Sequence, residues 1–464
     1  MKFSTYTIFR PALVFCLILS VFSCKKFVDI GTPDGTVPAA EVFKTDAAAT
    51  AAVGALYSNA NWRDAMLFST NFTGASADEQ IYNFTDVIKD FETNSIAPNN
   101  SYLSSYLWMF PYREIVNANI AVTGLNSSTT LTPAVKNQLL GEAKFWRALA
   151  YLQMNTIFGG VPLSLSDQPL DIALLPRSSA EAVNTQIITD LKDAKALLNP
   201  AYPSTERARV NIYAVSALLA RVYLYQKDWI NAEAEATAVI SSGVYSMSPL
   251  ATTFVKTSNE TILQIFTLNG FTQWGATFVP SSATATPNWY LTNNMVSSFE
   301  TGDGRKTNWT AALGTSGNSY VNKYKLRSGT AGNEYYVVLR LAEQYLIRAE
   351  ARAQRNNLTG VNGAEADLNV VRNRASLGSL LNLNQLDMLS AIEKERRVEL
   401  FAEWCHRWFD LKRTAGFTNS VITRADEVLS VFKGAKWQST DVLYPINADE
   451  IVKNPALIQN PGYN

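Results

Sequence analysis

Residues 139–158, LLGEAKFWRALAYLQMNTIF, are the stretch that decides the fold. Four apolar or small residues recur along it at helical spacing: Leu139, Ala143, Trp146 and Ala150. Such a stripe is typical of a helix that buries one face. Just upstream, Thr132 suits a helix N-cap and Pro133 suits the first helical position. The stretch therefore predicts a long, core-facing helix that begins near residue 133.

More helices are expected downstream. Ser178 and Glu181 have the spacing of a capping box. They precede an apolar stripe that ends at Pro200: Val183, Ile187, Leu191, Ala194 and Leu198. The next stripe is Val210, Ala214, Ala217, Arg221 and Tyr225. After a break at Lys227-Asp228, a partner helix is predicted from Trp229 to Ile240, ending before Gly243.

This last helix pair resembles a tetratricopeptide unit. Its small and large packing residues fall about where that repeat places them: Ala220, Tyr223, Asp228, Trp229, Ala232 and Ala236. Small residues let paired helices approach closely, and aromatic residues fill the hollows between them. A second, interrupted copy spans Tyr345 to Arg374, with an insertion at 356–363. The matches together favour several stacked helix pairs over one simple bundle.

The pattern along the chain predicts a mostly α protein with a loop-rich part. Helices dominate about 45–70, 104–242 and 335–415, which form the scaffold. Thr, Ser, Asn and Gly dominate about 71–103 and 244–334, where Thr261–Leu268 and Tyr335–Leu339 are the clearest short strands. Residues 24–44, with glycines and prolines, are expected to form an extended tether. Residues 45–464 are expected to form a single domain, closed by 416–464.

The first residues predict export. Lys2 and Arg10 precede an apolar run at about 11–22, and Ser23 precedes Cys24, so residues 1–23 have the features of a secretory signal. Val21-Phe22-Ser23-Cys24 resembles a lipobox, in which Cys24 becomes the lipidated first residue of the mature protein. Lipidation would anchor the protein to a membrane. The alternative is an ordinary signal peptide with an incidental cysteine.

Composition excludes several classes of protein. The formal net charge is 0 and only 17% of residues are charged, so there is no electrostatic footprint for nucleic acid. His406 is the only histidine, which excludes multi-histidine metal sites and disfavours a Ser-His-Asp arrangement. Cys405 is the only thiol left after export and lipidation, so no disulfide is expected. We predict neither a metal nor another cofactor.

Several motifs resemble the SusD/RagB family of outer-membrane nutrient-binding lipoproteins, in the family's order and over nearly the whole chain. They are Gly141 to Tyr151 with Phe158-Gly159-Gly160-Val161-Pro162-Leu163, Asp303-Gly304-Arg305, Glu395 to Leu400 with His406 to Arg413, Leu443 to Ile446, and Gln459 to Tyr463. One departure is Cys405, where the motif commonly has glycine. It leaves the local backbone geometry open.

The resemblance implies a fold and a function. The fold would be mostly helical, with about four tetratricopeptide-like helix pairs that support a variable, loop-rich ligand-binding face. The function would be to capture oligosaccharides at the cell surface and deliver them to a partner SusC-type TonB-dependent transporter in the outer membrane. Some relatives handle peptides instead, so a helical-repeat lipoprotein that binds peptides or proteins is the main alternative.

Glycan capture calls for flat aromatic rings, which match the C–H face of a sugar, and for polar side chains around its hydroxyls. The candidate aromatic platforms are Trp62, Tyr82, Trp274, Trp289, Tyr290 and Trp309. The candidate polar partners are Arg63, Asp78 and Asn83. For each aromatic residue, structural packing is the competing interpretation.

Catalysis is the less favoured alternative. Glycoside hydrolysis needs two carboxyl groups about 5 to 10 Å apart, and Asp78-Glu79 or Glu300 with Asp303 are the available pairs. No catalytic residue is predicted. The charged run at 393–399 is expected to form a solvated helix face with a few buried ion pairs, and His406 is expected to pack within a helix.

Overall fold

The computed structural model describes residues 39–168, 171, 173–282, 284–314 and 317–463. The predicted signal peptide, Cys24 and most of the predicted tether lie outside the described residues. Among the residues described, no helix is both long enough and apolar enough to cross a membrane. The described chain confirms the expected class, because helices predominate and the strands are few and short.

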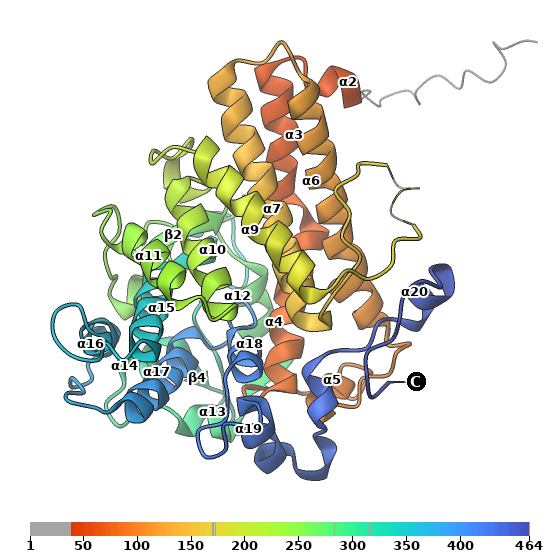
Figure 1. The fold of residues 1–464 in the computed structure, drawn as a ribbon. Coiled ribbons are helices and arrows are strands. Elements are labelled where there is room, and N and C mark those ends of the chain that lie inside the picture. Colours follow the sequence, from red (N-terminus) through yellow and green to blue (C-terminus); the bar gives the residue numbers. More distant parts are fainter. Residues whose placement is uncertain (1–38, 169–170, 172, 283, 315–316, 464) are drawn as a thin grey trace, which may run out of the picture.

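Four helices stand side by side in the upper part of the molecule (Figure 1). They are α3 (Asp46–Ser58), α6 (Phe110–Ser127), α7 (Pro133–Phe158) and α9 (Ala180–Leu197), and the short α2 (Ala39–Val42) precedes them. The stripe predicted on α7 is confirmed, since all four of its residues are at most 1% exposed. Gly141 lets α9 approach closely, because a Cβ there would lie 2.6 Å from Leu198. The α9 N-cap is Ser179, so the capping box expected at Ser178 is one residue too early.

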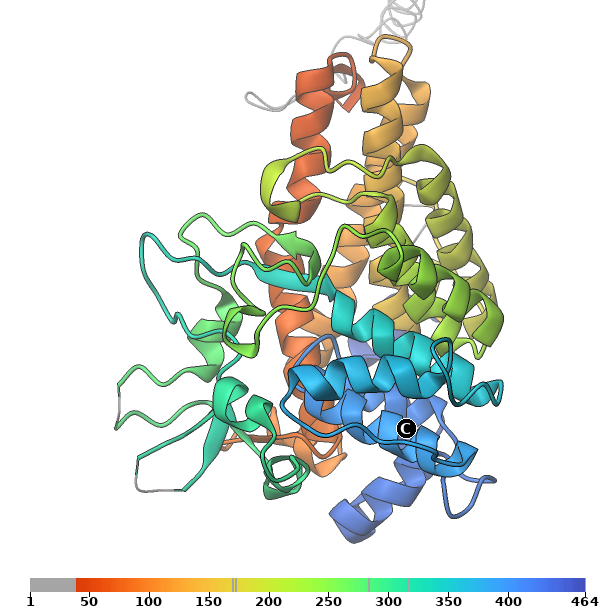
Figure 2. The same ribbon diagram turned by 90° about the vertical axis from the view of Figure 1, so that its left-hand side faces the viewer.

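A second group of helices lies below and beside the first (Figures 1 and 2). It comprises α10 (Ile212–Tyr225), α11 (Trp229–Ile240), α15 (Leu341–Gln354), α16 (Ala364–Arg374) and α17 (Gln385–Leu400). The α10–α11 and α15–α16 pairs pack as the sequence predicts, and α11 also packs on α15. The small residues Ala232, Ala236 and Ala349 are fully buried, as close helix pairing requires.

The loop-rich part carries three separate antiparallel strand pairs on one side of the helices (Figure 2). They are β1 (Gln80–Tyr82) with β3 (Trp289–Leu291), β2 (Thr261–Ile265) with β6 (Tyr336–Arg340), and β4 (Thr310–Ala312) with β5 (Ser319–Val321). Short helices lie between the strands: η4 (Thr205–Arg207), η5 (Leu250–Thr252), α12 (Gln273–Phe278), α13 (Asn293–Ser297) and α14 (Gly304–Trp309).

The remaining elements connect the two parts. Near the N-terminus these are α4 (Ala60–Ser76), α5 (Lys89–Thr93) and the π-helical η3 (Leu103–Met109). After α17 the chain forms α18 (His406–Arg413), α19 (Arg424–Lys433), η6 (Gly434–Lys436), η7 (Ser439–Val442) and α20 (Ala448–Lys453). Helix α4 continues six residues beyond the expected helical segment, and all six are buried.

Charged side chains form part of the interior. Arg340 of β6 pairs with Glu260, Glu399 and Glu403, and all four residues are at most 8% exposed. We use the name ionic core for these residues and their charged neighbours: Glu260, Asp303, Arg305, Arg340, Arg374, Glu395, Glu399 and Glu403. The few buried ion pairs expected at 393–399 are present, since Glu395, Arg396 and Glu399 are buried and paired, and they leave less of this run solvated than the sequence suggests. Ion pairing makes that burial possible.

The loop between α17 and α18 has an unusual backbone. Ala402, Trp404 and Cys405 all have positive φ, and Cys405 has φ 63°. Glycine adopts this left-handed conformation without a steric cost, which explains why it is common at this place in the family motif. Buried contacts hold the loop, since the indole N–H of Trp404 donates to the carbonyl of Val337 at 2.9 Å. His406 is 3% exposed, so its expected packing role is confirmed.

Candidate functional site

Three of the expected aromatic platforms are interior residues. Trp62 is 0% exposed. Trp274 stacks on Tyr336 with ring centroids 3.5 Å apart. The Trp309 ring packs against Lys323 and two arginines of the ionic core, and its N–H donates to the carbonyl of Leu250. We expected exposed rings, and the structure instead gives these three a packing role, because their faces contact other side chains.

Asp78 is also interior, and its carboxylate is already occupied. It accepts two hydrogen bonds from Arg407, at 2.8 and 3.1 Å, and one from Asn294. Burial alone would raise the pKa of Asp78. The guanidinium groups of Arg407 and Arg397 lower it by more than burial raises it, to about 2. Asp78 therefore fastens the chain after α4 to α18, in place of the expected contact with a sugar hydroxyl.

Arg63 is half-buried and makes no ion pair with any described residue.

The structure brings three other expected residues together. Strand pairing places Tyr82 opposite Trp289 and Ile81 opposite Tyr290. The rings of Tyr82 and Trp289 lie 4.9 Å apart, and both residues are at most 8% exposed. Asn83, the next residue along the chain, is exposed. Strands β1 and β3 thus form a surface that we name the aromatic wall: Tyr82, Trp289 and Tyr290. The side-chain amide of Asn83 lies at its edge.

In front of this wall lies a row of half-buried rings that we name the aromatic ledge: Phe68, Tyr102, Tyr106 and Phe110. The Phe68 and Tyr106 centroids are 4.3 Å apart, and Tyr106 packs on Phe110 at 5.3 Å. Tyr102 and Tyr106 are parallel within 17°, with centroids 5.7 Å apart. Buried Phe72 links Tyr102 to Trp289. The row is thus supported from behind by the aromatic wall.

A π-helical segment positions the two tyrosines. Tyr102 immediately precedes η3, and the N–H of Phe110 donates to the carbonyl of Ser105, five residues earlier. The two tyrosines are four positions apart along this segment, and their rings stack within 17° of parallel. Segments of this kind are rare and occur frequently at functional sites. Both residues are half-buried, so each ring leaves part of its surface open to solvent.

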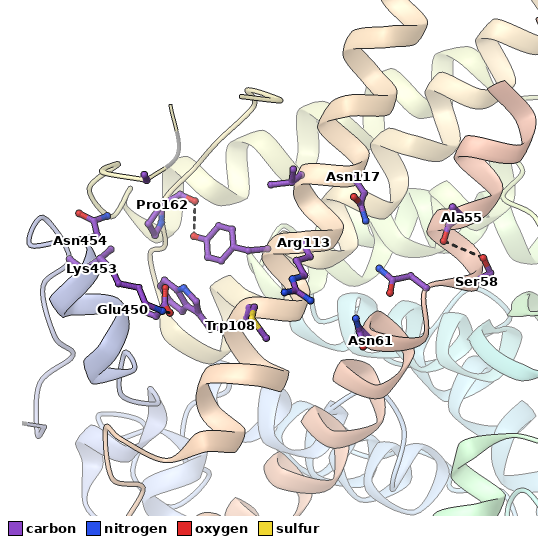
Figure 3. Close-up of a pocket in the computed structure, with 16 residues that line it drawn as sticks. Ala55, Ser58, Asn61, Trp108, Arg113, Asn117, Pro162, Glu450, Lys453 and Asn454 are labelled. Atoms are coloured by element: carbon purple, nitrogen blue, oxygen red, sulfur yellow. Dashed lines mark hydrogen bonds and ion pairs between the residues drawn. The ribbon is translucent and has the colours of Figure 1, made fainter. Parts of the chain in front are cut away.

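A pocket of about 910 Å³ adjoins the ledge, and we name it the ledge pocket (Figure 3). Phe110 connects the two, because the Arg113 guanidinium lies over its ring at 6.0 Å. Arg113 and Asn117 of α6 lie between Asn61 on α4 and the α20 residues (Figure 3). Arg113 is exposed and has no ion-pair partner among the described residues.

The wall of the ledge pocket combines aromatic rings with polar groups. Trp108 and Tyr112 lie 5.2 Å apart, and the Tyr112 hydroxyl donates to the carbonyl of Pro162 at 2.8 Å. On the opposite side Lys453 pairs with Glu450 at 2.8 Å. Amides, a free guanidinium and flat rings around one open space are the groups that a sugar needs.

These residues were not among the site residues predicted from the sequence. Tyr102, Tyr106 and Phe110 recur every four positions, which on a regular helix indicates one packed stripe. The available signal was the density of aromatic residues between 102 and 112, where five of eleven positions are Tyr, Trp or Phe. It does not reveal the π-helical turn that exposes them.

A buried carboxyl group lies behind the ledge pocket. Glu114 of α6 is 0% exposed, and it accepts one hydrogen bond, at 2.9 Å, from Asn59, which lines the pocket. Its second oxygen has no hydrogen-bond partner among the described residues. Burial raises the pKa of Glu114 to about 8, so the group is largely neutral at pH 7.

Comparison with known proteins agrees with this architecture of stacked helix pairs and a loop-rich side. Residues 40–224 match a family model described as starch-binding and associating with the outer membrane, and residues 267–463 match the model of the SusD family. The chain belongs to the SusD/RagB family. SusD-like protein P25 of Formosa agariphila is 23% identical, with 97% of each chain covered. A SusD-like protein of Bacteroides ovatus is 29% identical over 43% of this chain and 36% of its own.

Solved structures show the same fold. A laminarin-binding SusD-like protein has a TM-score of 0.76 and 24% identity, and covers 90% of this chain and 100% of its own. Surface glycan-binding protein A of Bacteroides uniformis has a TM-score of 0.75 and 21% identity, and covers 89% of this chain and 99% of its own.

Glu114 predicts a pH dependence of stability. Its folded-state pKa is raised above the ordinary value of 4.5, so its contribution to stability is fully present below pH 4.5 and is lost as the pH rises to about 8. The loss is about 1.4 kcal/mol for each unit of pKa shift. Glu114→Gln keeps a neutral side chain and should flatten the decline. Urea unfolding of the wild type and of Glu114→Gln at pH 5, 6.5 and 8 measures the free energy of unfolding. An equal decline with pH in the two proteins would contradict the raised pKa of Glu114.

Proposed function

We propose that this protein captures oligosaccharides and delivers them to a SusC-type TonB-dependent transporter in the outer membrane. The observation that carries the proposal is the aromatic ledge with its adjoining pocket. A sugar presents C–H groups on its faces, and an aromatic ring face attracts them. The solvent-exposed parts of the two half-buried tyrosine rings can therefore receive the C–H faces of a bound sugar chain. The free Arg113, Asn61 and Asn117 then bind hydroxyl groups.

The relatives support a carbohydrate ligand. One solved neighbour is named for binding laminarin, and another is named a surface glycan-binding protein. One family model is described as starch-binding. We extend the ligand class, an oligosaccharide, to this chain. Binding by two rings and a few hydrogen bonds would give a dissociation constant between about 1 µM and 1 mM. That range suits a protein that must release its cargo to a transporter.

We propose binding without catalysis. The carboxylates that the sequence offered as acid–base pairs are held by arginines: Asp78 by Arg407, Glu300 by Arg372, and Asp303 by Arg305. Glu79 is buried, and burial together with Asp78 raises its pKa to about 7. Carboxylates that neutralise arginines inside the protein are poorly placed to attack or protonate a glycosidic bond.

The ledge can be tested by replacing its tyrosines. Tyr102→Ala and Tyr106→Ala should each weaken the binding of laminarihexaose, or of another oligosaccharide found by array screening, at least tenfold, since each removes one ring face. Isothermal titration calorimetry measures the affinity, and thermal unfolding checks the fold. Phe266→Ala is the matched control, because Phe266 is a 50% exposed ring in the loop-rich part.

If both tyrosine variants bind the oligosaccharide with wild-type affinity, the aromatic ledge is not part of the binding site. Binding of peptides in place of every oligosaccharide would favour the peptide-binding alternative.

We also propose that Cys24 carries lipid and holds the protein on the outer membrane, facing the cell exterior. In the producing cell, Cys24→Ala should move the protein from the membrane pellet to the soluble extracytoplasmic fraction, because acyl chains supply the membrane affinity. Fractionation followed by immunoblotting measures the shift, and Cys405→Ala is the control. A Cys24→Ala protein that still needs detergent for extraction would contradict the lipobox assignment.

A further inference from the structure

A second cleft, of about 700 Å³, lies among α13, α17 and α19, at the lower end of the molecule in Figure 1. It shares no lining residue with the ledge pocket. One face of α17 lines it, with residues at positions i, i+3, i+4 and i+7: Ser390, Glu393, Lys394 and Arg397. Helix α19 contributes an apolar wall that includes Phe432, which is 41% exposed. The cleft therefore combines a charged floor with a ring.

Two of its three arginines donate hydrogen bonds to carboxylates through two or more of their nitrogens. Arg407 donates to both oxygens of Asp78 and, at 2.9 Å, to Glu393. Arg424 donates to Glu393 at 2.8 Å and to Glu427 at 2.5 Å. The carboxylates that line the cleft thus accept hydrogen bonds from these two arginines: Asp78, Glu393 and Glu427.

Arg397 is the exception. Its side chain is 14% exposed, and its Nη2 lies 2.8 Å from Oδ2 of Asp78. Neither Nε nor Nη2 makes a hydrogen bond with any described residue, although both atoms are buried. The short distance to Asp78 is therefore a contact between charges with poor hydrogen-bond geometry. The remaining nitrogen, Nη1, also has no hydrogen-bond partner among the described residues.

Arg407 and Arg397, the two arginines beside Asp78, differ in how far nearby carboxylates offset the effect of burial on their pKa values. Burial lowers the pKa of Arg407, but Asp78 and Glu393 more than offset this effect, and its pKa is raised. Burial also lowers the pKa of Arg397, and the positive charge of Arg407 adds to this effect, so Asp78, Glu79 and Glu393 do not offset it and the pKa stays below its usual range. A polar group without partners calls for an explanation, such as an ion or ligand that completes it. Since Nε and Nη2 are buried, Nη1 is the nitrogen of Arg397 that can bind an anion in the cleft.

We propose that this cleft binds an acidic sugar residue, a uronate, through Arg397. A carboxylate matches the geometry of a guanidinium group and forms strong, charge-assisted hydrogen bonds with it. The exposed ring of Phe432 offers a surface for the sugar's C–H face, and the hydroxyls of Ser298 and Ser390 lie on the same lining. The inference goes beyond the proposed function, because it assigns a separate, charge-selective site that shares no residue with the ledge.

The test is calorimetric titration of the protein with trigalacturonate at low ionic strength. Arg397→Gln should weaken binding at least tenfold, since the amide carries no positive charge to pair with the carboxylate. Phe432→Ala should weaken it several-fold, and this exposed position provides a second variant if Arg397→Gln folds poorly. The control is Lys306→Gln, which removes one positive charge from an exposed residue of α14 that makes no ion pair with any described residue.

Three results would overturn the proposal: no binding of trigalacturonate at millimolar concentration, wild-type affinity in Arg397→Gln and Phe432→Ala, or an equal loss in Lys306→Gln. A second titration, with inorganic sulfate, tests whether the cleft distinguishes a uronate from a simple anion. Sulfate that binds as tightly as trigalacturonate would show a general anion site and would overturn the assignment to a sugar.

Discussion

The ion pairs between Arg340 and the carboxylates of Glu260, Glu399 and Glu403 are the contacts on which the rest of the structure depends. Arg340 ends strand β6 and immediately precedes α15, so it stands where the loop-rich part joins the helical scaffold. Glu260 adjoins β2, while Glu399 lies near the end of α17 and Glu403 in the loop after it. One guanidinium group therefore fixes a strand pair against a helix far away in sequence.

Neighbouring charges extend this contact into a network. Arg305 of α14 bridges Asp303, Glu395 and Glu399, and Arg374 of α16 reaches Glu260 and Glu399. Taking charges out of water is costly, and the removal of one partner leaves the other uncompensated, at a cost of about 3 to 5 kcal/mol. The network therefore requires all its members and specifies one arrangement. A similar contact between Asp78 and Arg407 fastens the chain between α4 and β1, and so supports the aromatic wall behind the ledge.

The helical scaffold was predictable from the sequence because helix periodicity is local. The bounds expected for α11 agree with the structure, and the insertion between the helices of the second repeat is present at 355–363. For the charged run at 393–399, the buried ion pairs were expected, but the residues that form them could not be predicted. Its acids and arginines have the spacing of a solvated face, and only partners far away in sequence, such as Arg305 and Arg340, make their burial possible.

The site was less predictable, since exposure depends on tertiary contacts. Tryptophans 274 and 309 lie in loop-rich sequence and have no helical stripe to explain them, yet Tyr336 and the ionic core cover them. Tyr102 and Tyr106 have the spacing of a packed stripe, yet a π-helical turn makes them a surface. The strand pairing that joins Tyr82 to Trp289 also spans more than 200 residues of sequence. Residue type alone could not separate these cases.

The most direct test of the central claim is a crystal structure of the protein with a bound oligosaccharide that has first been shown to bind in solution. The account predicts sugar density over the rings of Tyr102 and Tyr106 that continues toward Arg113 in the ledge pocket. Sugar density confined to another surface, with the two rings left open to solvent, would contradict it.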